Sequence, residues 1–217
     1  MTPTPVSFKN IPTIHEIKNG YPSVRALFFD MDGTIFNTEF IHAEALLKMA
    51  LKYQIKIPFN PQTMYELMVG KADHLLFDII QSWEGVPQHW NVESFVLEKN
   101  SLVIEILQKT SLETYFATGV QKLLKEAKSN GFYLGLVTSS EKIITKKLLK
   151  LTELENFFHL ILTRDDCPKH KPDPWPYLKA MEISGHETHE IIIFEDSRVG
   201  IEAAIASGNH VIKVEWY

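Results

Sequence analysis

The stretch Val24-Arg-Ala-Leu-Phe-Phe-Asp-Met-Asp-Gly-Thr34 decides how the rest of the chain is interpreted. Residues 24–29 form a mainly apolar run, typical of a buried strand, that stops abruptly at two aspartates and a glycine. Similar short runs recur over residues 132–137, 159–162, 191–194 and 210–214. The first three of these also stop at polar side chains. The sequence therefore predicts a set of buried strands that open into polar loops.

Helical patterns lie between these predicted strands. Val120, Leu123, Leu124 and Ala127 recur at helical spacing, and Asn130-Gly131 supplies a stop. Strands that are apolar throughout and alternate with helices favour a parallel sheet covered on both faces. The predicted fold class is therefore α/β.

Residues 38–115 differ from the rest, because helical patterns dominate there and no strand-like run occurs. We interpret them as an all-helical insert just after the first strand of an α/β core, which consists of residues 24–37 and 116–217. Residues 1–23 contain four prolines and scattered polar residues. They are predicted to be an arm or an added edge segment, with a loosely packed extension favoured.

Composition and charge narrow the class of protein. The chain has 217 residues, of which 45% are hydrophobic and 23% are charged, a balance typical of a soluble globular protein. Its net charge of −5 and its lack of a basic run argue against general nucleic-acid binding and attachment to anionic membranes. The single cysteine, Cys167, fits a reducing compartment, and no apolar run approaches the length of a membrane helix. We expect a cytoplasmic enzyme or binding protein, with a monomer favoured.

The polar clusters after the strands are the candidates for chemistry, because the carboxyl ends of parallel strands share one edge of a sheet, where ligands bind. The clusters and one later loop supply Asp30, Asp32, Thr138, Ser139, Lys171, Glu195 and Asp196. Converging carboxylates repel one another unless a cation lies between them, and oxygen ligands with few histidines indicate Mg²⁺. Such an ion beside a lysine and a hydroxyl suits a phosphoryl group. One carboxylate can then attack phosphorus, while a second exchanges protons with the leaving oxygen and with water.

Four motifs resemble, in order, the four signatures of the haloacid dehalogenase superfamily. They are Asp30-Met-Asp-Gly-Thr34, Val137-Thr-Ser-Ser140, Lys171-Pro-Asp-Pro174 and Phe194-Glu-Asp-Ser-Arg-Val-Gly200. Four ordered matches make chance a weak explanation, and the resemblance covers residues 24–214. It implies a Rossmann-like parallel sheet, with the helical insert corresponding to the small cap that closes over the substrate.

Carried over residue by residue, the resemblance implies a role for each motif. Asp30 would be the nucleophile and a Mg²⁺ ligand. Asp32 would be the general acid and base, with its backbone carbonyl on the metal. Thr138 would hold phosphate oxygens, and Lys171 would pair with Asp30 and the phosphoryl group. The metal site would be completed, directly or through water, by Asp196 and Glu195.

Substrate contacts are expected from the motif loops and from the cap. Ser139 is a candidate phosphate contact beside Thr138, and Arg198 is a candidate substrate contact, although a surface arginine is the simpler interpretation. The segment Leu67-Met-Val-Gly-Lys-Ala-Asp-His74 is similar to the cap segment of relatives that act on small substrates. These include pseudouridine-phosphate and sugar- or polyol-phosphate phosphatases and β-phosphoglucomutase. Lys71 in this segment either contacts the leaving group or points into solvent.

Together these patterns predict a Mg²⁺-dependent phosphatase. It would hydrolyse a small phosphomonoester, such as a sugar, polyol or nucleoside phosphate, through an aspartyl-phosphate intermediate on Asp30. A phosphosugar mutase of the β-phosphoglucomutase type stays open, because it shares the covalent step. A phosphonoacetaldehyde hydrolase with a Schiff base on Lys71 fits less well, since those relatives lack an aspartate at the position of Asp32. A non-catalytic relative is disfavoured by the four chemically intact motifs.

Overall fold

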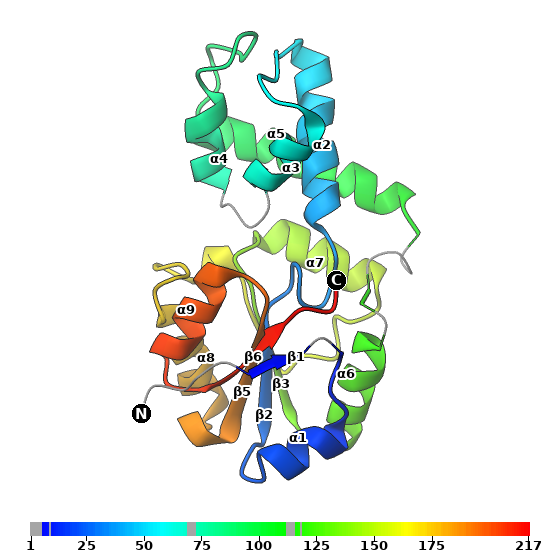
Figure 1. The fold of residues 1–217 in the computed structure, drawn as a ribbon, viewed down its shortest axis with the longest axis vertical. Helices are drawn as coiled ribbons and strands as arrows, with labels where there is room; N and C mark the ends of the chain where they lie inside the picture. The colour runs from blue at the N-terminus through cyan, green and yellow to red at the C-terminus, as the bar shows by residue number, and fades with distance from the viewer. Residues whose placement is uncertain (1–5, 9, 69–72, 112–115, 118) are drawn as a thin grey trace. The chain divides into compact units, whose positions relative to one another are not determined.

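The computed structural model describes residues 6–8, 10–68, 73–111, 116–117 and 119–217. It divides the chain into two compact units (Figure 1). One consists of Met1–Asn37 with Leu112–Tyr217 and is called the core unit below, and the other, Thr38–Ser111, is called the helical unit. The chain thus leaves the core unit once and returns to it once.

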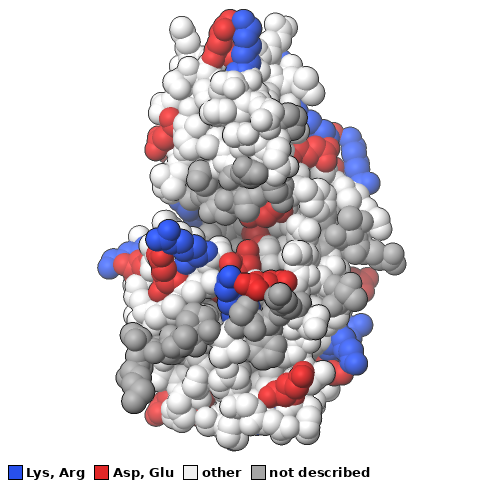
Figure 2. Space-filling view, viewed as in Figure 1, with Lys and Arg blue, Asp and Glu red and all other residues white. Residues whose placement is uncertain are grey.

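The exposed surface carries both signs of charge. On the face drawn in Figure 2, the basic and acidic side chains of the described residues form small mixed groups without a continuous basic area. None of the described helices is both long enough and apolar enough to cross a bilayer.

The core unit contains a six-stranded sheet in the order β1-β6-β5-β2-β3-β4, and every neighbouring pair of strands is parallel. The strands are β1 (Val6–Phe8), β2 (Ala26–Phe29), β3 (Tyr133–Val137), β4 (Leu160–Leu162), β5 (Ile191–Glu195) and β6 (His210–Val214). All five strands that the apolar runs predicted are therefore present. Helices cover both faces, so the predicted α/β class with a Rossmann-like parallel sheet is confirmed.

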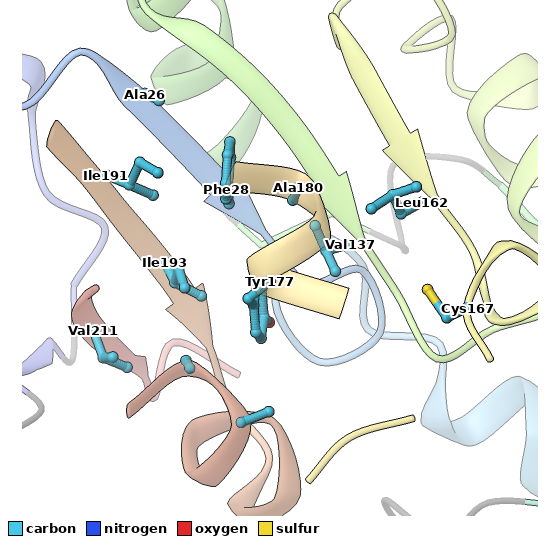
Figure 3. Packing of buried hydrophobic residues seen from close by; sticks show 12 residues of the cluster. Ala26, Phe28, Val137, Leu162, Cys167, Tyr177, Ala180, Ile191, Ile193 and Val211 are labelled. Carbon is cyan, nitrogen blue, oxygen red and sulfur yellow. The ribbon is translucent and has the colours of Figure 1, made fainter. Parts of the chain in front are cut away.

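The helices divide between the two faces of the sheet (Figure 1). α8 (Trp175–Ser184) and α9 (Arg198–Ala206) pack on one face, while α1 (Ile14–Gly20) and α6 (Val120–Ser129) lie together on the other. The remaining helical elements of this unit are α7 (Lys142–Leu151) and the short 3₁₀ turns η2 (Arg164–Asp166) and η3 (Thr188–Glu190). Phe28, Val137 and Ile193, from three neighbouring strands, pack with Tyr177 and Ala180 of α8 (Figure 3). This packing fixes the strands whose carboxyl ends carry the candidate residues.

The order of the strands places β2 at a switch point. From β2 the chain builds β3 and β4 on one side of the sheet, and it later crosses to build β5 and β6 on the other side. The loops after β2, β3 and β5 therefore lie at the carboxyl edge beside the switch point, where open α/β sheets bind their ligands.

Residues 6–8 and 14–20 form regular structure, and the loosely packed extension that we expected is wrong for them. β1 pairs in parallel with β6, with Val6 opposite Ile212. α1 follows Thr13, which caps it, and buries Ile14 and Ile17. A strand of three residues is too short to show a sequence period. Its partner β6 also lies at the other end of the chain, so no local pattern indicates the pairing. The alternative of an added edge segment describes residues 6–8 correctly.

The helical unit consists of α2 (Glu39–Tyr53), α3 (Pro61–Met68), α4 (Asp73–Ile80) and α5 (Val92–Lys109). α2 packs along α5, and the core of the unit includes Met49, Phe77, Trp90 and Phe95. No strand occurs among its described residues, as the helical periodicity predicted.

Candidate active site

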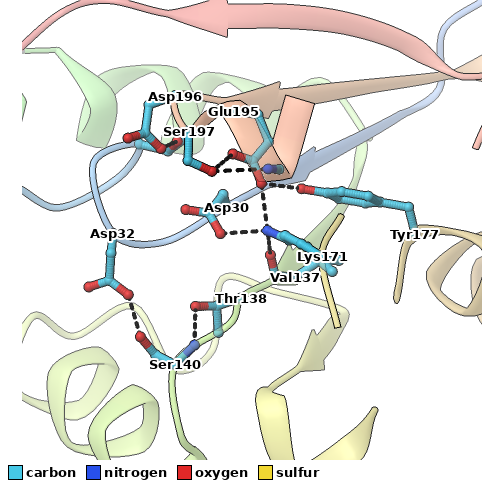
Figure 4. Close-up of polar contacts among 12 residues, drawn as sticks. Asp30, Asp32, Val137, Thr138, Ser140, Lys171, Tyr177, Glu195, Asp196 and Ser197 are labelled. Carbon is cyan, nitrogen blue, oxygen red and sulfur yellow. Dashed lines mark hydrogen bonds and ion pairs between the residues drawn. The ribbon is translucent and has the colours of Figure 1, made fainter. Parts of the chain in front are cut away.

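The loops at the carboxyl edge bring the predicted residues together. Asp30 directly follows β2, Thr138 follows β3, Glu195 ends β5, and Asp196 comes next. Lys171 reaches the same place from the loop before α8 (Figure 4). Figure 4 shows these side chains and that of Asp32 gathered in one region, although they come from four separate segments.

Lys171 is the hub of the cluster. Its Nζ donates hydrogen bonds to Asp30 Oδ1 at 2.7 Å, to Glu195 Oε1 at 2.5 Å and to the Val137 carbonyl at 2.9 Å. Its side chain is 3% exposed. Burial acts to lower the pKa of Lys171, but Asp30 and Glu195 outweigh it and hold that pKa well above its ordinary range. The lysine therefore stays charged and fixes two carboxylates relative to each other.

Glu195 is fully buried and held from three sides. Besides Lys171, the Tyr177 hydroxyl donates to its Oε1 at 2.8 Å, and the Ser197 hydroxyl donates to its Oε2 at 3.2 Å. Ser197 is also the N-cap of α9, because its Oγ accepts from the Gly200 N–H at 3.1 Å. A Cβ at position 200 would overlap the Glu195 carboxyl group, so glycine is required there.

Burial and neighbouring carboxylates raise the pKa values of Asp30 and Asp196. Burial raises the pKa of Asp30 well above its ordinary value; Lys171 opposes this, while Glu195 and Asp196 add to it. Burial also raises the pKa of Asp196 to about 7, and the charge of Glu195 adds to it. The Thr34 hydroxyl, which donates to Asp196 Oδ1 at 3.1 Å, works in the opposite direction.

These carboxylates fit a divalent cation. One oxygen each from Asp30, Glu195 and Asp196 lie within 4.8 Å of one another. The donors are carboxylate oxygens, which Mg²⁺ prefers over nitrogen and sulfur ligands. A cation would also offset the repulsion among the carboxylates, which adds to the effect of burial on the pKa values of Asp30 and Asp196.

Asp32 and Thr138 are linked by a residue that we did not predict. Ser140 Oγ donates a hydrogen bond to Asp32 Oδ2, and the Ser140 N–H donates to Thr138 Oγ1 at 3.0 Å (Figure 4). Ser140 was available in the quoted second motif, but its spacing alone does not say which loop it faces. Tyr177 was also missed, because an aromatic residue in an apolar helix face predicts only packing.

Of the three predicted substrate contacts, Ser139 and Arg198 lie outside this cluster. Ser139 is exposed beside Thr138. The Arg198 side chain is 90% exposed and pairs with Glu202 on its own helix at 2.8 Å. Lys71 lies outside the described residues. All three assignments stay predictions.

A parallel α/β sheet with an acidic cluster ordered by one lysine at its carboxyl edge defines a class of metal-assisted hydrolases. Comparison with known proteins agrees: residues 27–214 match the haloacid dehalogenase-like hydrolases. The chain belongs to this family.

Two relatives and one solved structure extend the comparison. A phosphoglycolate phosphatase of Nitrosospira multiformis is 29% identical over 197 residues, which cover 89% of this chain and 84% of the relative. A phosphorylated carbohydrates phosphatase of Thermotoga maritima is 28% identical over 185 residues, which cover 85% and 82%. The crystal structure of CbbY from Rhodobacter sphaeroides with phosphate has the same fold, with a TM-score of 0.77 at 21% identity over 88% of this chain and 85% of that one. The chain is therefore an enzyme of the haloacid dehalogenase-like hydrolases, similar to phosphatases, and the non-catalytic alternative is set aside.

Proposed function

We propose that this enzyme is a Mg²⁺-dependent phosphomonoesterase that forms an aspartyl-phosphate on Asp30. The observation that best supports this proposal is the buried Lys171 ammonium group. Its Nζ lies 2.7 Å from Asp30 Oδ1 and 2.5 Å from Glu195 Oε1. Lys171 orients the Asp30 carboxyl group and leaves its second oxygen to attack. Its charge also attracts the incoming phosphoryl group.

The first half of the reaction transfers the phosphoryl group to the enzyme. A carboxylate oxygen of Asp30 attacks phosphorus, and the bond from phosphorus to the alcohol oxygen of the substrate breaks. Asp32, in its protonated form, donates its proton to that leaving oxygen, so the product leaves as a neutral alcohol. Thr138 supplies a hydroxyl donor to the oxygens of the transferring group.

The second half returns the enzyme to its starting state. Asp32, now a carboxylate, accepts a proton from water as the water oxygen attacks phosphorus. The bond from phosphorus to the Asp30 oxygen then breaks and releases inorganic phosphate. Ser140, which donates to Asp32 Oδ2, keeps this carboxyl group oriented through both halves.

The proposed ligands of Mg²⁺ are Asp30 and Asp196, together with the backbone carbonyl of Asp32. Glu195 acts mainly through Lys171, because its oxygens already accept from Lys171, Tyr177 and Ser197; it reaches the ion directly or through water. When bound, the ion supplies positive charge that offsets the carboxylates and the transferring group.

The substrates we propose are small sugar, polyol or nucleoside monophosphates. The similarity to a phosphorylated carbohydrates phosphatase supports a sugar-type substrate, and the similarity to a phosphoglycolate phosphatase supports a small phosphorylated acid as a further member of the test panel. Phosphate release across such a panel, at fixed Mg²⁺, ranks the classes. A substrate that is isomerised with no release of phosphate would identify a mutase and contradict the hydrolase proposal.

Asp30→Asn tests the covalent step. We expect phosphate release to fall by at least 10³-fold, whereas the carboxyl-to-amide control Glu182→Gln, on an exposed position of α8, should retain activity. Acid quenching of Asp32→Asn with p-nitrophenyl phosphate, whose leaving group needs no proton, should leave a phosphoryl group on the peptide that contains Asp30. A chelator should abolish activity and Mg²⁺ should restore it. Equal turnover by wild type and Asp30→Asn would refute the mechanism.

A further inference from the structure

Trp216 and Tyr217, which follow β6, contact the loop that carries Asp32. The Trp216 indole Nε1–H donates to the Thr34 carbonyl at 2.8 Å, and the Tyr217 hydroxyl donates to the Ile35 carbonyl at 2.7 Å. The Trp216 ring also lies beside that of Phe194 on β5, with ring centroids 6.2 Å apart. These side chains therefore complete the hydrogen bonding of a loop that is more than 180 residues away in sequence.

The Tyr217 hydroxyl also holds the returning chain. It accepts a hydrogen bond from the Ala117 N–H at 2.9 Å. Ile35 precedes the point where the chain leaves the core unit, at Asn37, and Ala117 follows the point where it returns, at Leu112. One hydroxyl thus joins the outgoing and the returning stretches.

The same two stretches are paired beside Tyr217. Phe36 and Phe116 form an isolated antiparallel bridge, and their ring centroids lie 4.9 Å apart. A bridge of one residue pair is a weak connection without a sheet around it. The Tyr217 hydroxyl adds a donor and an acceptor next to it and fixes the distance between the two stretches.

The loop that Trp216 and Tyr217 contact is itself bonded to the acidic cluster. The loop that receives the two hydrogen bonds begins at Asp32, which forms a bridge with Phe36. The Gly33 N–H donates to the Phe36 carbonyl at 2.7 Å, and the Thr34 hydroxyl donates to Asp196. A displacement of residues 34–36 would therefore move the acid/base carboxyl group and the partner of a metal-binding carboxylate together.

We propose that Trp216 and Tyr217 form a clasp that positions Asp32 for proton transfer. They are positioning residues, since they act through the loop of residues 32–36 and hold the two crossing stretches together at Phe36 and Phe116. This inference rests on the proposed role of Asp32 as general acid and base. It adds two residues, outside all four motifs, to the determinants of the reaction.

The test compares two leaving groups. An alkyl phosphate needs a proton on its leaving oxygen, whereas p-nitrophenolate leaves without one, and kcat/KM reports only the steps up to formation of the phosphoenzyme. Tyr217→Phe keeps the ring and removes the hydroxyl. We expect kcat/KM to fall about 10-fold for the alkyl ester and to stay within about twofold for p-nitrophenyl phosphate, because a misplaced acid affects the first substrate selectively.

Three further variants make the result decisive. Trp216→Phe, which removes the donor to Thr34, should give the same selective loss. Tyr53→Phe is the matched control: it removes a hydroxyl that donates to Glu98 at 2.7 Å within the helical unit, and it should not change the ratio of the two kcat/KM values. In an Asp32→Asn background, Tyr217→Phe should cause no further selective loss.

The outcomes separate the clasp from the mechanism beneath it. If Asp32→Asn lowers both substrates equally, Asp32 is not the acid and the proposed function fails at that step. If Asp32→Asn is selective for the alkyl ester while Tyr217→Phe and Trp216→Phe affect both substrates equally or neither, the clasp is refuted and the mechanism stands. Selective losses in both clasp variants support the proposal.

Discussion

Gly33 offers the sharpest test of how closely the acidic cluster is built. Its φ is +78°, and a Cβ at this position would lie 2.6 Å from Cγ of Asp196 and closer still to Oδ2. Carbon atoms in ordinary contact are about 3.5–4.0 Å apart, so Gly33→Ala must push the Asp196 carboxyl group away by about 1 Å. The substitution therefore combines backbone strain with displacement of a proposed metal ligand.

Gly131 separates these two effects. Its φ is +77°, nearly that of Gly33, yet a Cβ there would meet nothing within 4 Å. Gly131→Ala should therefore show the strain alone, on the order of 1 kcal/mol, which corresponds to a loss of about 2–4 °C in Tm for a chain of this size. Gly33→Ala should show a similar or somewhat larger loss of Tm.

Activity should distinguish the two variants. A misplacement of about 1 Å at a reacting centre costs on the order of 10²-fold, so kcat/KM for Gly33→Ala should fall about 100-fold, and the Mg²⁺ concentration for half-maximal activity should rise. Gly131→Ala should retain wild-type kcat/KM and the wild-type Mg²⁺ requirement. If both variants keep full activity while losing the same Tm, the position of Asp196 does not control the reaction and the reasoning is wrong.

Two further predictions concern charge. Because the pKa of Asp196 is about 7 in the folded chain and 3.8 in the unfolded chain, the metal-free protein binds this proton more tightly when folded. Its free energy of unfolding should therefore decline as the pH rises from about 4 to 7, by on the order of 4 kcal/mol. Thermal melts should show a flatter decline in Asp196→Asn, and Mg²⁺ should oppose the decline in wild type. Identical pH profiles for the two proteins would contradict the raised pKa of Asp196. In the helical unit, Lys99 and Asp73 form an ion pair with side chains 4% and 12% exposed. Lys99→Met should lower the free energy of unfolding by about 3 kcal/mol in urea titrations. Lys56→Met, whose pair with Glu84 is about 70% exposed on both sides, should change it by under about 0.5 kcal/mol, and equal losses would show that burial of the first pair is unimportant.

The predicted strands and the convergence of the motifs could be read from the sequence for a physical reason. A strand of a parallel sheet is apolar on both faces, and the residue after it lies at the carboxyl edge, so Phe29 followed by Asp30 marks both features at once. The same argument applies to Val137 before Thr138. Each of these signals is local, since it depends on a boundary between a buried run and a polar loop.

The features that sequence analysis missed depend on partners far along the chain. Tyr177 resembles any core aromatic residue until the fold places its hydroxyl beside Glu195. Ser140 is visible in a motif, but its bond to Asp32 joins residues 108 positions apart. β1 becomes a strand only because β6 offers an unpaired edge. Tertiary contacts decide these features, and no local pattern contains them.

The contacts of the four carboxyl groups also explain why a cation belongs in this site. Within the described part of the chain, Lys171 contacts Asp30 and Glu195, and a phosphoryl group would bring further negative charge to the cluster of Asp30, Asp32, Glu195 and Asp196. Protonation would relieve the repulsion, but it would remove the Asp30 nucleophile. A cation relieves it while Asp30 stays ionised, which is why the electrostatics that raise the pKa values of Asp30 and Asp196 also make metal binding favourable. Stability of the core unit and activity should therefore respond to the same ion.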